Sequence, residues 1–180
     1  LFLHLHNGTG DLSGIKQGED GGRAQVLTVK SGKTEVVENP RFKDVPTSYP
    51  FYNEIAWLAT KKITTGWPDG TYRPSAPVER GQMAAFLYRM AGSPAYTPPS
   101  KSPFKDVSTN YVFYKEISWL ASQGITTGWP DGTFRPSASV ERGQMAAFMY
   151  RMAGSPAYTP PAKSPFKDVS TNYVFYRQVA

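Results

Sequence analysis

The chain has 180 residues, a net charge of +6, 39% hydrophobic and 14% aromatic residues, and no cysteine. This composition is enough to bury a core, and no apolar run approaches the roughly 18 residues of a membrane-spanning helix, so we expect no membrane insertion. The lack of cysteine excludes disulfides, thiolate zinc sites and cysteine nucleophiles, although it does not fix the compartment.

Residues 1–41 differ in kind from the rest of the chain. The stretches 26–29 (VLTV) and 35–37 (EVV) flank Ser31-Gly32-Lys33, a pattern that indicates a β-hairpin. We expect this segment to be the tail of an upstream β-rich region or a linker. The first residues show no signal-peptide pattern and no initiator Met, and the last residues stop inside a repeated pattern, so both ends are interpreted as cut.

A repeat of 62 residues organises the remainder. Phe42-Lys43-Asp44-Val45 returns at 104–107 and again at 166–169. Residues 42–103 and 104–165 differ at 12 of 62 positions, so 50 are identical, and residues 166–180 begin a third copy. One helical pair of this size cannot bury its apolar face alone, so we expect neighbouring copies to share a core.

Each copy predicts two helices. The first covers residues 50–60, with Pro50 in its first turn, and the second covers about 79–91, with Gly92 as its stop. The second copy repeats this pattern, with its second helix over 141–153. The apolar residues at helical spacing are Phe51, Ile55, Leu58 and Ala59 in the first helix, and Met83, Phe86, Leu87 and Met90 in the second.

A turn-rich loop separates the helices, and a proline-rich linker separates the copies. Residues 63–74 read ITTGWPDGTYRP, whose Pro-Asp-Gly centre is a strong turn signal flanked by short extended pieces. Residues 92–103 contain four prolines and predict a stiff linker, which recurs at 154–165.

The basic excess lies in the copies, with seven basic and four acidic side chains in 42–103 and six and four in 104–165. A surface of this kind favours anionic partners such as acidic polysaccharide, nucleic acid or lipid headgroups, and it does not choose among them.

The order of these motifs closely resembles the S-layer homology domain. The Phe-x-Asp-Val start, the Gly-Trp-Pro-Asp-Gly loop and the Val-Glu-Arg-Gly-Gln-Met helix start recur in the right order, fully over 42–165 and in part over 166–180. The resemblance implies a mainly α fold of tandem helix-loop-helix repeats, in which three repeats form a pseudo-threefold unit with grooves between them. It implies an extracellular location at the bacterial cell wall or surface. It also implies non-covalent anchoring of a surface protein through an anionic secondary cell-wall polysaccharide, often pyruvylated, or a peptidoglycan-linked glycan.

The same resemblance implies the ligand-binding residues. The arginine of the family's Thr-Arg-Ala-Glu motif, the aspartate of Phe-x-Asp-Val and the Gly-x-x-Asp-Gly loop all have counterparts here. Guanidinium can grip a sugar carboxylate, aspartate can accept sugar hydroxyls, and an indole offers a flat face to a pyranose ring. The candidate ligand-binding residues are Asp44, Trp67, Asp69, Arg80, Asp106, Trp129, Asp131 and Arg142.

Two departures from the family pattern are relevant. Glu79-Arg80-Gly81-Gln82 stands where the family has Thr-Arg-Ala-Glu, which predicts a poor helix cap and puts a carboxylate beside the arginine. Pro50 and Val112 replace the family's usual tryptophan before the first helix.

Several candidates also have a purely structural interpretation. Arg80 and Arg142 would each pair with a neighbouring acid at a helix end. Asp44 and Asp106 would cap the turn that leads into the first helix. Trp57 and Trp119, which lie within the first helices, are expected to be packing residues, whereas the loop tryptophans are better ligand candidates.

Other function classes receive less support. Carboxylates that would serve glycosidase chemistry, such as Asp44, Glu54 and Glu79, all recur in the second copy, and two near-identical active sites would be unusual. No helix carries a basic stripe, so nucleic-acid binding is not predicted. His4 and His6 have no evident third ligand, and the calcium-loop and P-loop patterns fail, so no metal and no cofactor is expected.

Two alternatives to wall anchoring stay open: a repeat module for protein–protein assembly at the cell surface, and the non-catalytic part of a cell-wall hydrolase. Residues 166–180 contain the start of a first helix without a second. We therefore expect one good groove, between the first two copies and involving Arg80 or Arg142, and a third copy that is either frayed or self-associating.

Overall fold

The computed structural model describes residues 26–30, 33–37 and 42–180, which belong to two compact units. In the first unit, β1 (Val26–Lys30) and β2 (Lys33–Val37) pair antiparallel, with Val26 opposite Val37. The predicted β-hairpin is confirmed, whereas His4 and His6 lie outside the described residues.

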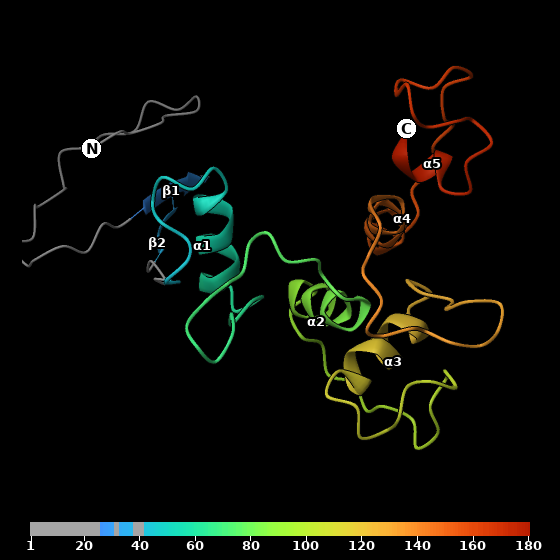
Figure 1. Ribbon diagram of the computed structural model, residues 1–180, viewed down its shortest axis with the longest axis horizontal. Helices are drawn as coiled ribbons and strands as arrows, with labels where there is room; N and C mark the ends of the chain where they lie inside the picture. The colour runs from blue at the N-terminus through green and yellow to red at the C-terminus, as the bar shows by residue number, and fades with distance from the viewer. Residues whose placement is uncertain (1–25, 31–32, 38–41) are drawn as a thin grey trace, which may run out of the picture. The chain divides into compact units, whose positions relative to one another are not determined.

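The second unit is helical, which confirms the mainly α prediction (Figure 1). None of the helices in the described part of the chain is long and apolar enough to cross a membrane. The helices are α1 (Tyr52–Thr60), α2 (Arg80–Met90), α3 (Tyr114–Ser122), α4 (Arg142–Met152) and α5 (Tyr176–Val179).

The helix boundaries follow the predicted periodicity, with two corrections at the start of the first helix. α1 begins at Tyr52, so the prediction that Pro50 lies in its first turn is wrong. Phe51, at the N-cap position, is exposed and does not join the predicted apolar face. α2 ends at Met90, and Gly92 follows in the left-handed conformation, with φ +85°, that ends many helices.

The first two copies share a core, as expected from the repeat. α2 of the first copy packs against α3 of the second (Figure 1). The ring of Trp119 on α3 meets Tyr88 on α2 edge-on, with centroids 5.3 Å apart. The buried cluster consists of Met83, Ala84, Leu87, Tyr88, Phe104, Val107, Tyr114, Ile117, Trp119, Leu120, Ile125, Phe134 and Phe148.

The linker between these copies has no regular secondary structure, and a hydrogen bond holds it near each end. The Tyr88 hydroxyl, from α2, donates to the Pro94 carbonyl at 2.6 Å, and the Tyr114 hydroxyl, from α3, donates to the Pro99 carbonyl at 2.6 Å. Since each tyrosine extends from a buried helix, the linker is held against the shared core.

The start of α2 is capped by the second copy. The N–H groups of Arg80 and Gly81 donate to the carbonyls of Ala138 and Pro136, at 2.9 and 2.8 Å. The Glu79 N–H donates to Gln82 Oε1 at 3.2 Å. The prediction of a poor cap is therefore wrong for α2, because the orphan donors of its first turn find acceptors in the neighbouring copy.

Candidate ligand-binding site

Each loop is built on its Trp-Pro-Asp-Gly turn. In the second copy, the Gly132 N–H donates to the Trp129 carbonyl at 2.9 Å, and the Trp129 N–H donates to the Thr133 carbonyl at 2.8 Å. Gly128 has φ +67°, and a Cβ there would lie 2.7 Å from the Thr133 carbonyl oxygen. Glycine is therefore required where the loop closes on itself.

Both carboxylate oxygens of each loop aspartate have a partner within the same loop. Asp131 Oδ1 accepts from the Thr133 hydroxyl at 2.6 Å and from its N–H at 3.0 Å, while Oδ2 pairs with Arg135 at 3.0 Å. These contacts, the Thr133 hydroxyl foremost, lower the pKa of Asp131 to about 2. Asp69 has the same environment in the first copy, and its pKa is also about 2.

In each loop, an arginine side chain stacks on the tryptophan ring. The guanidinium carbon of Arg73 lies 4.1 Å from the ring centroid of Trp67, and that of Arg135 lies 4.1 Å from the ring centroid of Trp129. This cation–π stacking covers one face of each indole. Trp67 is exposed overall, whereas Trp129 is half-buried.

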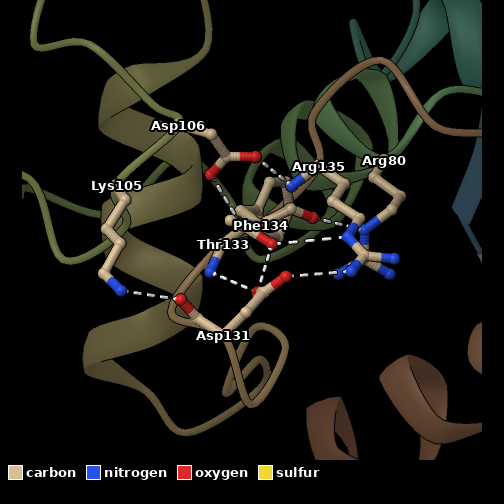
Figure 2. A network of polar contacts seen from close by, with 7 residues as sticks. All are labelled: Arg80, Lys105, Asp106, Asp131, Thr133, Phe134 and Arg135. Carbon is tan, nitrogen blue, oxygen red and sulfur yellow. Dashed lines mark hydrogen bonds and ion pairs between the residues drawn. The ribbon is translucent and has the colours of Figure 1, made fainter.

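The Phe-x-Asp-Val aspartates hold the end of each loop, just after its turn. Asp106 accepts from the N–H groups of Phe134 and Arg135, both at 2.7 Å (Figure 2). Asp44 does the same for its own loop, at 2.8 and 2.7 Å, and these bonds, the Tyr72 N–H first, lower its pKa. The expectation that these residues cap the turn into the first helix is therefore wrong, because their partners lie in the loop that follows that helix.

Arg80 joins the two copies. Its side chain is buried, its Nε donates to the Phe134 carbonyl at 2.7 Å, and its Nη1 donates to Gln144 Oε1 at 2.9 Å. The guanidinium carbon lies 4.7 Å from the ring centroid of Phe134, 5.4 Å from that of Phe148 and 5.9 Å from that of Trp129. Arg80 is thus surrounded by residues of the second copy.

No carboxylate among the described residues forms an ion pair with Arg80, so the expected pairing with a neighbouring acid is wrong. Burial lowers the pKa of Arg80, the charge of Arg135 lowers it further, and Asp106 opposes both. The guanidinium carbons of Arg80 and Arg135 lie 5.9 and 4.1 Å from the ring centroid of the same residue, Trp129. The junction therefore holds the charge of Arg80 in a partly desolvated place, beside the ion pair of Arg135 and Asp131.

The candidates divide into three groups. At the junction the guanidinium carbon of Arg80 lies 5.9 Å from the ring centroid of Trp129. The Arg80 side chain also bonds to the loop that Asp106 and Asp131 hold (Figure 2). The first-copy residues, Asp44, Trp67 and Asp69, form an equivalent loop by themselves. Arg142 is exposed, and no hydrogen bond or ion pair joins it to a side chain in the described part of the chain.

Sequence reasoning missed four residues of the junction. Arg135, Thr133, Phe134 and Gln144 all contact the predicted candidates. The arginine that recurs in both loops, four residues after the aspartate, is the signal that could have identified Arg135. Trp129 adds an unsatisfied donor, since its indole N–H is buried with no acceptor among the described residues.

Comparison with known proteins agrees with this architecture. The sequence profile of the S-layer homology domain matches residues 41–84 and 103–146. The chain carries two S-layer homology domains. These domains place it outside the cell, at the bacterial wall or surface.

No group of three or more His, Asp or Glu side chains in the described residues is arranged to hold a metal ion.

The relatives include an anchoring protein, S-layer proteins and enzymes. The chain is 30% identical over 77% of its length to a cellulosome-anchoring protein of Acetivibrio thermocellus, of which it covers 31%. It is 29% identical over 60% of its length to S-layer protein EA1 of Bacillus anthracis, and 34% identical over 61% to an endoglucanase of a Bacillus species, of which it covers 12% and 11%. The chain thus spans less than a third of each of these proteins.

Proposed function

We propose that this chain holds an extracellular protein on the bacterial cell wall, non-covalently, by binding an anionic secondary cell-wall polysaccharide at the junction of its two S-layer homology domains. The observation that carries the proposal is Arg80, a buried guanidinium beside a second arginine and with no carboxylate paired to it among the described residues. The relatives named as cellulosome-anchoring and S-layer proteins support it.

The chemistry of the junction fits a sugar that carries an acidic group. Arg80 donates through Nε and Nη1 to neutral acceptors, so its charge is not cancelled by those bonds. A carboxylate on the ligand would balance the charge of Arg80, whereas Arg135 is already paired with Asp131. The buried indole N–H of Trp129 would gain the acceptor it lacks. Trp67, exposed in the first loop, offers a second surface on which a sugar ring can stack.

We further propose that the chain itself is not catalytic. Asp69 and Asp131, with pKa values of about 2, stay ionised at neutral pH and cannot act as general acids. The carboxylate oxygens of Asp44 and Asp106 are occupied by backbone N–H groups. The endoglucanase relative favours one second candidate, in which these domains are the non-catalytic part of a hydrolase.

Co-sedimentation with insoluble cell wall tests the proposal. We expect wall that retains its polysaccharide to deplete the protein from solution, and added salt to weaken the binding. Wall stripped of polymer should not bind. A protein that remains in solution with intact wall would overturn anchoring, and equal binding to stripped wall would overturn the polysaccharide.

Two matched variants locate the site. Arg135→Gln removes a guanidinium at the junction, and Arg73→Gln removes the equivalent group from the first loop, away from Arg80. We expect Arg135→Gln to weaken wall binding about tenfold and Arg73→Gln to weaken it less. A larger loss in Arg73→Gln would move the site to the first loop.

A further inference from the structure

Arg80 uses only some of its hydrogen-bond donors within the described part of the chain. A guanidinium has five N–H donors. Here Nε bonds to the Phe134 carbonyl at 2.7 Å and Nη1 to the side-chain oxygen of Gln144 at 2.9 Å, and both acceptors are neutral. No hydrogen bond joins Nη2 to a described residue, and Nη2 is not one of the enclosed polar atoms that lack a partner, so it keeps contact with solvent. Arg80 is therefore held in place with its charge intact and a donor still available.

The carboxylates of the junction are occupied by other partners. Asp131 pairs with Arg135 at 3.0 Å (Figure 2). Asp106 accepts from the backbone N–H groups of Phe134 and Arg135, both at 2.7 Å. Among the described residues, Gln144 is therefore the one side chain that forms a hydrogen bond with the guanidinium of Arg80, and it is a neutral amide.

The equivalent glutamine of the first copy makes a different contact. Gln82 and Gln144 are the third residues of α2 and α4. The side-chain oxygen of Gln82 accepts from the Glu79 N–H at 3.2 Å and so helps to cap its own helix. The side-chain oxygen of Gln144 accepts from Arg80, which lies 64 positions away in the other copy. The two glutamines are thus a matched pair, of which Gln144 alone bonds to Arg80 in the described part of the chain.

A glutamate would fit the place of Gln144 but would change the charge of the junction. Glutamate and glutamine have nearly the same shape, and a carboxylate oxygen accepts from Nη1 as the amide oxygen does. Gln144 is 9% exposed and Arg80 is 5% exposed, so solvent screens charges weakly there. A carboxylate at this position would form a charge-assisted bond with the guanidinium and balance its charge. The amide keeps the hydrogen bond and avoids that loss of charge.

We propose that Gln144 makes the junction selective for acidic sugars, because it orients Arg80 without neutralising it. Arg80 then keeps its charge and its Nη2 donor for a carboxylate on the ligand, and a neutral sugar gains much less. Gln144 acts through Arg80 and is therefore a positioning residue. The inference rests on the proposed function for its natural ligand, and it assigns the charge selectivity of that same site.

NMR titration of the full chain with glucuronate, a sugar that carries a carboxylate, tests the selectivity. The reporter is the Nε–H signal of Arg80, which the Phe134 carbonyl holds in place, and its loss in Arg80→Met identifies it. We expect glucuronate to shift this signal until the site is saturated, and glucose, which is neutral, to leave it in place. No shift with glucuronate, or an equal shift with glucose, would overturn the proposal.

Two matched variants separate the contact with Arg80 from the net charge of the chain. Gln144→Glu and Gln82→Glu change the net charge equally, and a carboxylate in place of the Gln82 amide still accepts from the Glu79 N–H. We expect Gln144→Glu to weaken glucuronate binding by at least about tenfold and Gln82→Glu to leave it nearly unchanged. Equal losses in the two variants would mean that net charge, and not this contact, governs binding.

A third variant, Gln144→Met, separates neutrality from the hydrogen bond. Methionine is uncharged and of similar length, but its thioether is a weak acceptor, so Arg80 keeps its charge and is held less firmly. We expect Gln144→Met to bind glucuronate better than Gln144→Glu does. In urea denaturation we expect the reverse order, with Gln144→Glu the more stable, because Arg80 keeps a partner there. The same order in both measurements would indicate a merely structural role and contradict the proposal.

Co-sedimentation with cell wall keeps this inference apart from the anchoring proposal. If Arg80 and the Gln144 variants respond to glucuronate as expected but the wild type stays in solution with intact wall, the role of Gln144 stands and anchoring fails. If the wild type and Gln144→Glu bind the wall equally well, anchoring stands and the role of Gln144 fails.

Discussion

The two complete copies share 50 of 62 residues, yet equivalent residues do different things. Arg80 is buried at a junction, whereas Arg142 is exposed. Trp119 is buried against Tyr88, whereas Trp57 is exposed. The difference arises because α2 and α3 pack against each other, whereas α4 packs against the shorter α5, and no helix in the described part of the chain packs extensively against α1. Position in the array therefore decides the role of a residue more than its identity does.

One of the few substitutions between the copies follows the same logic. Phe134 is fully buried beneath Arg80, while its counterpart, Tyr72, is half-buried and keeps a hydroxyl. Burial raises the pKa of Tyr72. A hydroxyl at Phe134 would have to find a partner in a closed interior, which the apolar ring avoids.

The largest contrast between the copies should come from their helical tryptophans. Trp119→Ala removes a buried ring from the shared core and should lower the free energy of unfolding by about 3–5 kcal/mol. Trp57→Ala should cost about 1–2 kcal/mol, because its ring is already partly in water. Urea denaturation of both variants measures the difference. Equal losses would mean that the copies fold without a shared core.

The equivalent arginines of the two copies, Arg80 and Arg142, should give the next largest difference in stability. Arg80→Met leaves the buried Phe134 carbonyl and Gln144 without their donor and should cost about 2–3 kcal/mol. Arg142→Met should change stability by less than about 0.5 kcal/mol, as for other exposed sites. Thermal unfolding checks both. A neutral Arg80→Met would show that the hydrogen bonds at the junction contribute little to stability.

Replacing the glycine at the second position of α2 or of α4 by alanine should change the free energy of unfolding in different directions. Alanine at Gly81 would push the Tyr111 hydroxyl out of the closed junction, at a net cost of about 1 kcal/mol. Gly143→Ala meets Tyr173, which is exposed and able to move away, so the gain in helix propensity should leave stability unchanged or slightly raised. Destabilisation of the same size at both positions, measured in urea, would contradict this asymmetry.

The sequence predicted the repeat, the hairpin, the helices and the shared core, because these follow from periodicity and turn residues. It also identified Arg80 and Trp129 as candidates, although whether they bind a ligand remains a prediction. It did not predict that Arg80 donates to Phe134 and Gln144, that Asp106 holds the loop, or that α2 is capped from the neighbouring copy. Those contacts join residues 28 to 64 positions apart, and a local pattern carries no information about them.

The smallest expected effect concerns the pKa values of Asp69 and Asp131. Their titration tests whether the loops of the two copies keep the same structure in solution. Both have pKa values of about 2, against 3.8 for an ordinary aspartate, with the threonine hydroxyl two residues later as the largest cause. A carboxylate whose pKa is depressed by folding stabilises the native state above pH 3.8, and that contribution is lost as the pH falls toward 2. Carboxyl NMR titration of the wild type should therefore show two midpoints near 2. In Thr71→Val the midpoint of Asp69 should rise, because its hydroxyl donor is gone, while Asp131 should not move, since its own Thr133 is intact. A wild-type midpoint near 3.8 at either residue would show that its loop is open in solution, and a shift of Asp131 in Thr71→Val would show that the two loops are coupled.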